Sequence, residues 1–329
     1  MNRRAQMRAA LECRLEGGPV PIWEIEFHSW DQASGRHVVL GEEFAALSPG
    51  EQDRALNVNA EILASVAEEM QFAALTVPGH RWEIAPGKAA YYWLPPEARI
   101  KQIRLLRKAA GSRLMIVAVT GGVMAMPSAA RYVDFCYKLF DAPEEIEARA
   151  RSVLDDGLAD AAIVCDLGVD VAVTASDIAD NRGPFFNPEQ LDRLIFPCLR
   201  EWAEGIRRFG MFAVLHTDGN VQPCLEGIAT SGIHAMQAVD PTAGMSMRRT
   251  LDQVRGRICL CGNVDCALLL TGTPETVYRG TADLLAECAD TGFVLGTSNA
   301  VAAETPVENY RAMVRAWRDA AGRKRPTGR

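Results

Sequence analysis

Short apolar runs alternate with longer stretches of helix-like patterning along this chain. Each apolar run is followed by residues with helical periodicity or a helix-start signal, such as the capping box Ser48-Pro49-Gly50-Glu51. Alternating strands and helices predict a parallel sheet, and eight such units predict an α/β fold of the closed (β/α)8 TIM-barrel type. The eight predicted strands are residues 22–28, 72–77, 114–119, 171–174, 211–215, 235–238, 257–261 and 293–295.

This pattern predicts one domain over residues 1–329. Residues 1–20 read as an N-terminal helical extension that ends at Gly17-Gly18, and residues 321–329 form a basic tail. The predicted second strand is followed by a long aromatic loop that contains Trp82 and Tyr92. Long loops after strands often cover a pocket, so both side chains are candidate substrate contacts; a packed surface loop is the alternative.

Charge and cysteine content narrow the class of protein. The net charge of −7 argues against nucleic-acid binding, which needs a basic face. Nine scattered cysteines in mostly apolar surroundings indicate buried thiols in a reducing compartment. The chain has no signal-peptide pattern and no run of eighteen apolar residues. We therefore expect a cytoplasmic protein without membrane association; a homodimer is compatible with the sequence, which does not fix the number of subunits.

Polar residues gather where the predicted strands end. In a (β/α)8 barrel these ends meet at the C-terminal mouth, where sites are built, although some of the residues will serve only as turn caps. The residues concerned are Glu26, His28, Ser176, Asp177, His216, Asp218, Asp240, Asn263, Asp265, Ser298 and Asn299.

The stretch His216-Thr217-Asp218-Gly219 is the most suggestive of these ends. Residues two apart on an extended backbone point to the same side, so the side chains of His216 and Asp218 should lie on the same side of the strand's C-terminal end. Such a pair can bind a metal, move a proton, or form a purely structural contact.

The first predicted strand carries Glu24, Glu26 and His28 on one face. Two carboxylates and an imidazole are costly to bury without partners. They would line a site if this face lies inside the barrel, and would have no role if the strand is a solvated edge.

The second half of the chain resembles the uroporphyrinogen decarboxylase (URO-D) superfamily, which also contains methylcobamide:coenzyme M methyltransferases. The similarity covers roughly residues 160–315. It is carried by Ser176-Asp-Ile-Ala-Asp-Asn-Arg-Gly183 with Asn187-Pro188, His216-Thr-Asp-Gly219, Gly262-Asn-Val-Asp265, Gly272-Thr-Pro274 and Glu304-Thr-Pro-Val-Glu-Asn309. The resemblance implies a (β/α)8 barrel with its site at the C-terminal mouth.

The sequence departs from both branches of that superfamily. The decarboxylases have an arginine-rich segment after the first strand, where this chain has the acidic Trp23-Glu-Ile-Glu-Phe-His28. The methyltransferases bind zinc through His-x-Cys and a further Cys. Here His216 matches the histidine, whereas Asp218 and Asn299 stand at the cysteine positions. This harder ligand set leaves two alternatives: zinc or another divalent ion, with Glu24, Glu26 or His28 completing the shell, or no metal at all.

Three functions are compatible with these features. The first is metal-assisted methyl transfer to a small molecule. Zinc would be held by His216, Asp218 and Glu24 or Glu26, and Glu26 or His28 would act as general base. The methyl donor would be a corrinoid carried by a corrinoid protein. The second is metal-free decarboxylation of a carboxylate smaller than uroporphyrinogen, with Asp177, Asp218 and His216 moving protons and Arg182 binding the carboxylate. The third is a non-catalytic barrel that binds a small molecule or corrinoid. Asn263, Asp265 and Asn299 are further candidate substrate contacts at the mouth.

Overall fold

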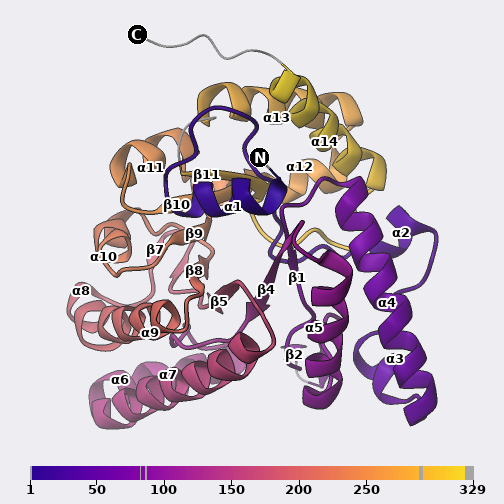
Figure 1. Ribbon diagram of the computed structural model, residues 1–329. Coiled ribbons are helices and arrows are strands. Elements are labelled where there is room, and N and C mark those ends of the chain that lie inside the picture. Colours follow the sequence, from indigo (N-terminus) through magenta and orange to yellow (C-terminus); the bar gives the residue numbers. More distant parts are fainter. Residues whose placement is uncertain (1, 82, 86, 289–291, 323–329) are drawn as a thin grey trace.

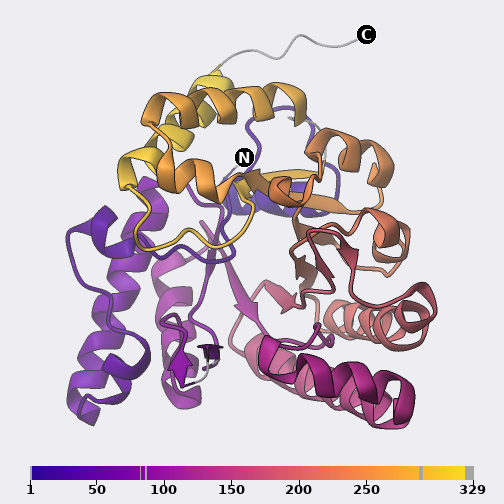
Figure 2. The same cartoon turned by 180° about the vertical axis from the view of Figure 1, so that it is seen from behind.

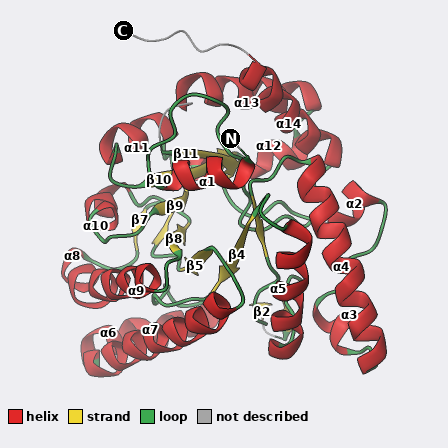
Figure 3. Ribbon diagram, viewed as in Figure 1, coloured by secondary structure: helices red, strands yellow, loops and turns green. Residues whose placement is uncertain are grey.

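Parallel strands form the centre of the computed structural model, and helices cover them on the outside (Figures 1 and 3). The structure describes residues 2–81, 83–85, 87–288 and 292–322. The main sheet has the strand order β1-β4-β5-β8-β9-β10-β11, with every neighbouring pair parallel. These strands are β1 (Ala74–Thr76), β4 (Met115–Val119), β5 (Val171–Ala175), β8 (Phe212–Thr217), β9 (Ala235–Ala238), β10 (Cys259–Val264) and β11 (Phe293–Thr297).

A short segment, residues 21–23, joins the two edges of this sheet; we call it the closing segment. Ile22 forms isolated parallel bridges with Phe72, just before β1, and with Leu295 in β11. The backbone of Trp23 donates to Leu295 O at 3.0 Å, and Ala73 N donates to Ile22 O at 2.7 Å. The closing segment thus takes the place of an eighth strand, and the predicted (β/α)8 barrel is confirmed.

The helices lie around this barrel in chain order (Figure 2). They are α1 (Arg3–Leu11), α2 (Trp30–Ser34), α3 (Gly41–Ala45), α4 (Pro49–Glu69), α5 (Pro96–Ala110), α6 (Tyr132–Asp141), α7 (Pro143–Asp166), α8 (Pro188–Gln190), α9 (Phe196–Arg208), α10 (Leu225–Ala229), α11 (Met247–Val254), α12 (Cys266–Thr271), α13 (Pro274–Cys288) and α14 (Val307–Gly322). Two hairpins stand outside the main sheet, β2 (Glu83–Ala85) with β3 (Lys88–Ala89), and β6 (Ala179–Asp180) with β7 (Gly183–Pro184).

The helix of the N-terminal extension is shorter than the sequence predicted, because α1 ends at Leu11. This helix lies across the N-terminal end of the barrel (Figure 1). The α1 residues Met7, Ala10 and Leu11 are buried, and Arg4 forms an ion pair with Asp170, the residue before β5. Residues 323–329, most of the predicted basic tail, lie outside the described residues.

The strands of the main sheet are almost fully buried, as the apolar runs predicted. Cys259 and Cys261 in β10 are buried thiols, as expected for a core strand. Within the described part of the chain, no helix is long and apolar enough to cross a membrane.

Candidate active site at the barrel mouth

Strand β8 delivers His216 to the C-terminal mouth, and Asp218 follows directly after the strand ends. The His216 Nε2 atom lies 4.0 Å from Asp218 Oδ1. Asp177, two residues beyond the end of β5, comes within 3.8 Å of the same nitrogen and accepts a hydrogen bond from Asp218 N at 3.0 Å. β5 and β8 are neighbours, and Ala175 pairs with His216. The expectation that these strand ends converge is therefore confirmed.

Asp177, His216 and Asp218 form what we call the site cluster. One ligand atom from each residue lies within 4.8 Å of the others. His216 is buried, and both aspartates are partly buried, so the cluster is shielded without being sealed from solvent.

Gln237 in β9 fixes the proton of His216. Its Nε2 donates to Thr297 O at 3.1 Å, so its Oε1 is the atom that faces His216 Nδ1. A carbonyl oxygen can only accept a hydrogen bond, so Nδ1 must carry the hydrogen. In the neutral ring, the lone pair of Nε2 then points toward two carboxylates. A cation at that position would be attracted by both carboxylates.

Asp218 is held on one side only. Asn299 Nδ2 donates to its Oδ2, whereas Oδ1 is buried and has no hydrogen-bond partner among the described residues. Burial raises the pKa of Asp218 to about 6; the His216 charge opposes this rise, and the Asp177 and Asp240 carboxylates add to it. A buried acceptor without a partner is costly unless a ligand supplies one.

The cluster fits a divalent cation. It offers an imidazole nitrogen with a free lone pair, a buried carboxylate oxygen without a partner, and a second carboxylate nearby. Imidazole and carboxylate together suit zinc and similar ions, and a hydrogen bond to the distal nitrogen is the usual support for a ligating histidine.

Glu26 and His28 form a separate pair, in which His28 Nε2 lies 2.8 Å from Glu26 Oε2. The His28 ring packs against Tyr91 and Tyr92, with ring centroids 5.4 and 5.2 Å apart. Tyr92 is buried, and its hydroxyl donates to Thr76 O at 2.9 Å. Part of the aromatic loop therefore packs onto His28, at the end of the segment predicted as the first strand, while Trp82 lies outside the described residues.

Glu24 lies apart from both groups, although the alternation of the first strand places it on the same face as Glu26. Its Oε2 accepts from the backbone and hydroxyl of Thr297 at 3.0 and 2.5 Å, and its Oε1 accepts from the Tyr310 hydroxyl at 2.8 Å. Burial raises the pKa of Glu24 to about 7, while these hydrogen bonds oppose the rise. With both oxygens engaged, Glu24 joins β11 to α14 and is not one of the cluster residues.

The remaining candidates have varied surroundings. Asn263 is buried and donates to Val239 O at 2.7 Å, and Asp265 caps α12 by accepting from Ala267 N at 2.8 Å. Asn299 contacts the cluster directly through Asp218. Arg182 is exposed in the turn between β6 and β7, beside the partly buried ring of Phe185 in a shallow surface cavity. Only Asn299 among these four touches the cluster.

Sequence reasoning missed Gln237 as a site residue and gave Asp240 no role. The only available signal was that Gln237 is the polar residue in an apolar strand, Ala235–Ala238, next to the His216 strand.

The fold and the cluster together define a (β/α)8-barrel protein with a histidine and carboxylates at its C-terminal mouth. The family described as uroporphyrinogen decarboxylase (URO-D) matches residues 97–320, and the chain belongs to this family. A curated relative, the uroporphyrinogen decarboxylase of Anaeromyxobacter dehalogenans (strain 2CP-C), is 25% identical over 222 residues. The match covers 64% of this chain and 60% of that relative, so it spans less than two thirds of the relative's length.

Solved structures share the fold over nearly the whole chain. A methyltransferase from Methanosarcina mazei superposes with a TM-score of 0.71 and 18% identity, covering 97% of this chain and 99% of that one. A B12-independent methionine synthase from Shewanella sp. W3-18-1 gives a TM-score of 0.59 and 13% identity, with 92% and 97% covered. At these identities the likeness establishes the fold, and the chemistry must be argued from the site.

Proposed function

We propose that this protein is an enzyme that transfers a methyl group to a small molecule with the help of a divalent metal ion held by the site cluster. The observation that carries the proposal is the convergence of the free His216 Nε2 lone pair with the partnerless, buried Asp218 Oδ1. The methyltransferase and methionine synthase titles of structures with this fold are consistent with the same chemistry.

His216, Asp218 and Asp177 would hold the ion, with zinc the preferred candidate. A bound zinc ion acts as a Lewis acid and lowers the pKa of a coordinated nucleophile, such as a thiol. Gln237 keeps the proton of His216 on Nδ1, and Asn299 orients Asp218 by donating to Oδ2. His28, which contacts Glu26 through Nε2, would serve as the general base that accepts a proton from the substrate. The methyl donor would be a corrinoid carried by a partner protein.

Zinc binding tests the metal part of this proposal. Protein dialysed against a chelator should bind about one equivalent of zinc by calorimetry and elemental analysis. His216→Ala should weaken that affinity by more than about 100-fold, because even the loss of a hydrogen-bond partner to a ligand costs about 10–100-fold. His37→Ala is the matched control, since His37 is exposed and pairs with Asp31 and Glu43 away from the cluster.

Methylation of a small thiol by methylcobalamin tests the reaction itself. Turnover should disappear on chelation and return with zinc. Full turnover in metal-free protein, or zinc binding that survives His216→Ala, would refute the metal-assisted mechanism. If His216→Ala changes neither turnover nor zinc content, the protein is better described as a small-molecule or corrinoid-binding barrel.

A second candidate is decarboxylation of a small carboxylate. The curated relative is named for that reaction, and Asp218, with its pKa raised to about 6, could hold and release a proton near neutral pH. Asp218 and His216 would then protonate the carbanion left after the carboxyl group departs, with Asp177 holding the charge of His216 and Arg182 binding a remaining carboxylate. Release of carbon dioxide by chelated protein distinguishes this reaction from methyl transfer.

A further inference from the structure

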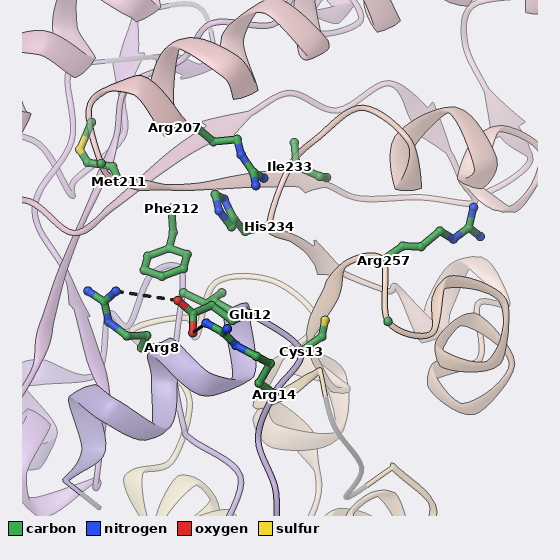
Figure 4. A pocket seen from close by; sticks show the side chains of 13 residues that line it. Arg8, Glu12, Cys13, Arg14, Arg207, Met211, Phe212, Ile233, His234 and Arg257 are labelled. Carbon is green, nitrogen blue, oxygen red and sulfur yellow. Dashed lines mark hydrogen bonds and ion pairs between the residues drawn. The ribbon is translucent and has the colours of Figure 1, made fainter.

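A cavity lies at the opposite end of the barrel from the site cluster. Its volume is about 470 Å³, and it is bounded by the end of α1 and by residues at the starts of β8, β9 and β10 (Figure 4). We call it the basal cavity. The side chains that matter below are Arg8, Glu12, Arg14, Arg207, Phe212, His234 and Arg257.

The basal cavity is strongly cationic in a chain whose net charge is −7. Four arginines line it against a single carboxylate, Glu12. Glu12 is shared between Arg14 and, at 3.8 Å, Arg8. This local excess of positive charge would raise the concentration of anions at the barrel base.

Arg207 is the least compensated of these arginines. Its Nη1 donates to the backbone oxygen of Gly232 at 2.9 Å, and no carboxylate forms an ion pair with it in the part of the chain that the structure describes. Arg257, in contrast, is paired with Glu226 at 2.6 Å. Arg207 therefore has donors left for a ligand, since a guanidinium carries five N–H groups.

His234 contributes a neutral donor beside Arg207 (Figure 4). Ala213 N donates to His234 Nδ1 at 2.9 Å, so the ring hydrogen sits on Nε2. Burial, and then the Arg207 charge, lower the pKa of His234 to about 4, which keeps the ring uncharged at neutral pH. Among the described residues, Nε2–H has no hydrogen-bond acceptor.

An apolar surface completes the basal cavity. The Phe212 ring lies 4.8 Å from the His234 ring and 5.4 Å from the Arg8 guanidinium, and Met211 and Ile233 also line the cavity. The arginine guanidinium groups and the His234 Nε2–H suit an oxyanion, while the apolar lining suits a compact apolar group.

We propose that the basal cavity binds a small organic oxyanion, namely a phosphate or carboxylate group attached to a compact apolar body. The oxyanion contacts Arg14, Arg207 and the His234 Nε2–H, and it replaces Glu12 as the ion-pair partner of Arg14. The apolar body packs on Phe212. This site is independent of the function proposed for the mouth, because no residue of the site cluster lines it.

Calorimetric titration at constant ionic strength tests the proposal with three probes: inorganic phosphate, phenyl phosphate and benzoate. Phenyl phosphate or benzoate should bind more tightly than inorganic phosphate, and which of the two is stronger identifies the headgroup. Arg14→Gln and Arg207→Gln should each weaken binding by about tenfold, the usual size of a lost charge-assisted hydrogen bond. The control is Arg151→Gln, an exposed arginine on α7 paired with Glu201, and it should leave affinity within about twofold.

His234 provides a second readout that needs no substitution. The protein has five histidines, so the ring nitrogens can be followed by NMR. Binding should shift the His234 Nε2–H signal and leave that of His37 in place. If none of the three probes binds above the ionic-strength control, or if Arg151→Gln weakens binding as much as Arg14→Gln, the basal cavity is not an anion site.

Discussion

A single amide, that of Gln237, decides what His216 can do. It is buried in β9, and its hydrogen bonds to His216 Nδ1 and Thr297 O connect the ends of β8 and β11, which are not adjacent in the sheet. Without an acceptor at Nδ1, the imidazole can carry its hydrogen on either nitrogen. In the tautomer with the hydrogen on Nε2, that atom has no lone pair to bind a metal.

Substitution at Gln237 should therefore change metal affinity more than folding. We expect Gln237→Leu to weaken zinc binding by about 10–100-fold, the range for loss of a ligand's hydrogen-bond partner. Gln237→Glu keeps an acceptor at Nδ1 and should retain the affinity. Calorimetry with zinc measures both, and equal affinity of the leucine and glutamate variants would contradict the positioning role.

The sequence predicted part of this residue-level picture. His216, Asp218 and Asp177 could be placed together because strand order and the i, i+2 rule bring them to one edge of the barrel. Gln237 could not, because it lies 21 positions from His216 in an apolar strand where nothing marks its partner. The basal cavity escaped notice for a similar reason, since its arginines come from separate segments of the chain.

At the level of elements, the apolar runs located seven strands of the main sheet to within a few residues. The first predicted strand, residues 22–28, differs because it pairs with the edges of the sheet only around Ile22, while Phe27 forms an isolated bridge with Val301 beyond the end of β11. Between these two positions, hydrogen bonds to Thr76 take the place of regular backbone pairing. Trp23 Nε1 donates to the Thr76 hydroxyl at 3.0 Å, and that hydroxyl donates to Glu24 O at 2.8 Å. The alternation of apolar and polar residues cannot predict that side-chain hydrogen bonds will replace the backbone hydrogen bonds of a strand.

Helix α7 packs unusually close to the loop after β4. A Cβ at Gly157 would lie 2.4 Å from Gly122 Cα and 2.5 Å from Gly122 N, which are backbone atoms that cannot rotate away. Gly157→Ala should lower the free energy of unfolding by about 1–3 kcal/mol, because overpacking outweighs the gain in helix propensity.

Gly280 in α13 provides the matched comparison. An added Cβ there meets only Leu268 Cδ2, at 3.2 Å, the mobile end of a side chain. Gly280→Ala should therefore be neutral or stabilise by up to about 1 kcal/mol. Urea unfolding of both variants checks the pair, and equal effects would show that backbone proximity at Gly157 is unimportant.

For the whole molecule, Glu24 ties the closing segment to the last strand and the last helix. Its carboxyl titrates near pH 7 in the folded protein and near 4.5 when unfolded. Between these values the folded state retains a proton that the unfolded state has lost. The contribution of Glu24 to stability is thus fully present below about pH 4.5 and is lost as pH rises through about 7.

Glu24→Gln removes this titration while keeping a polar side chain of the same shape. Between pH 5 and 7, the unfolding free energy of the native protein should fall relative to that of the variant, by at most about 1.4 kcal/mol per pH unit. Urea unfolding across this range measures the difference. Parallel pH profiles would show that the Glu24 carboxyl does not hold its proton preferentially in the folded state.

The closing segment also has a consequence for how the protein is made. Glu24 and its partner Thr297 are 273 positions apart, so synthesis of the barrel's first edge long precedes synthesis of the strand that covers it. Until β11 leaves the ribosome, the nascent barrel has an open seam of unpaired backbone on an apolar sheet. Such a seam is a site for mispairing between chains, and contacts this distant in sequence form late in folding. Stalling translation before residue 293 should therefore leave an aggregation-prone intermediate that β11 and α14 convert into the finished barrel.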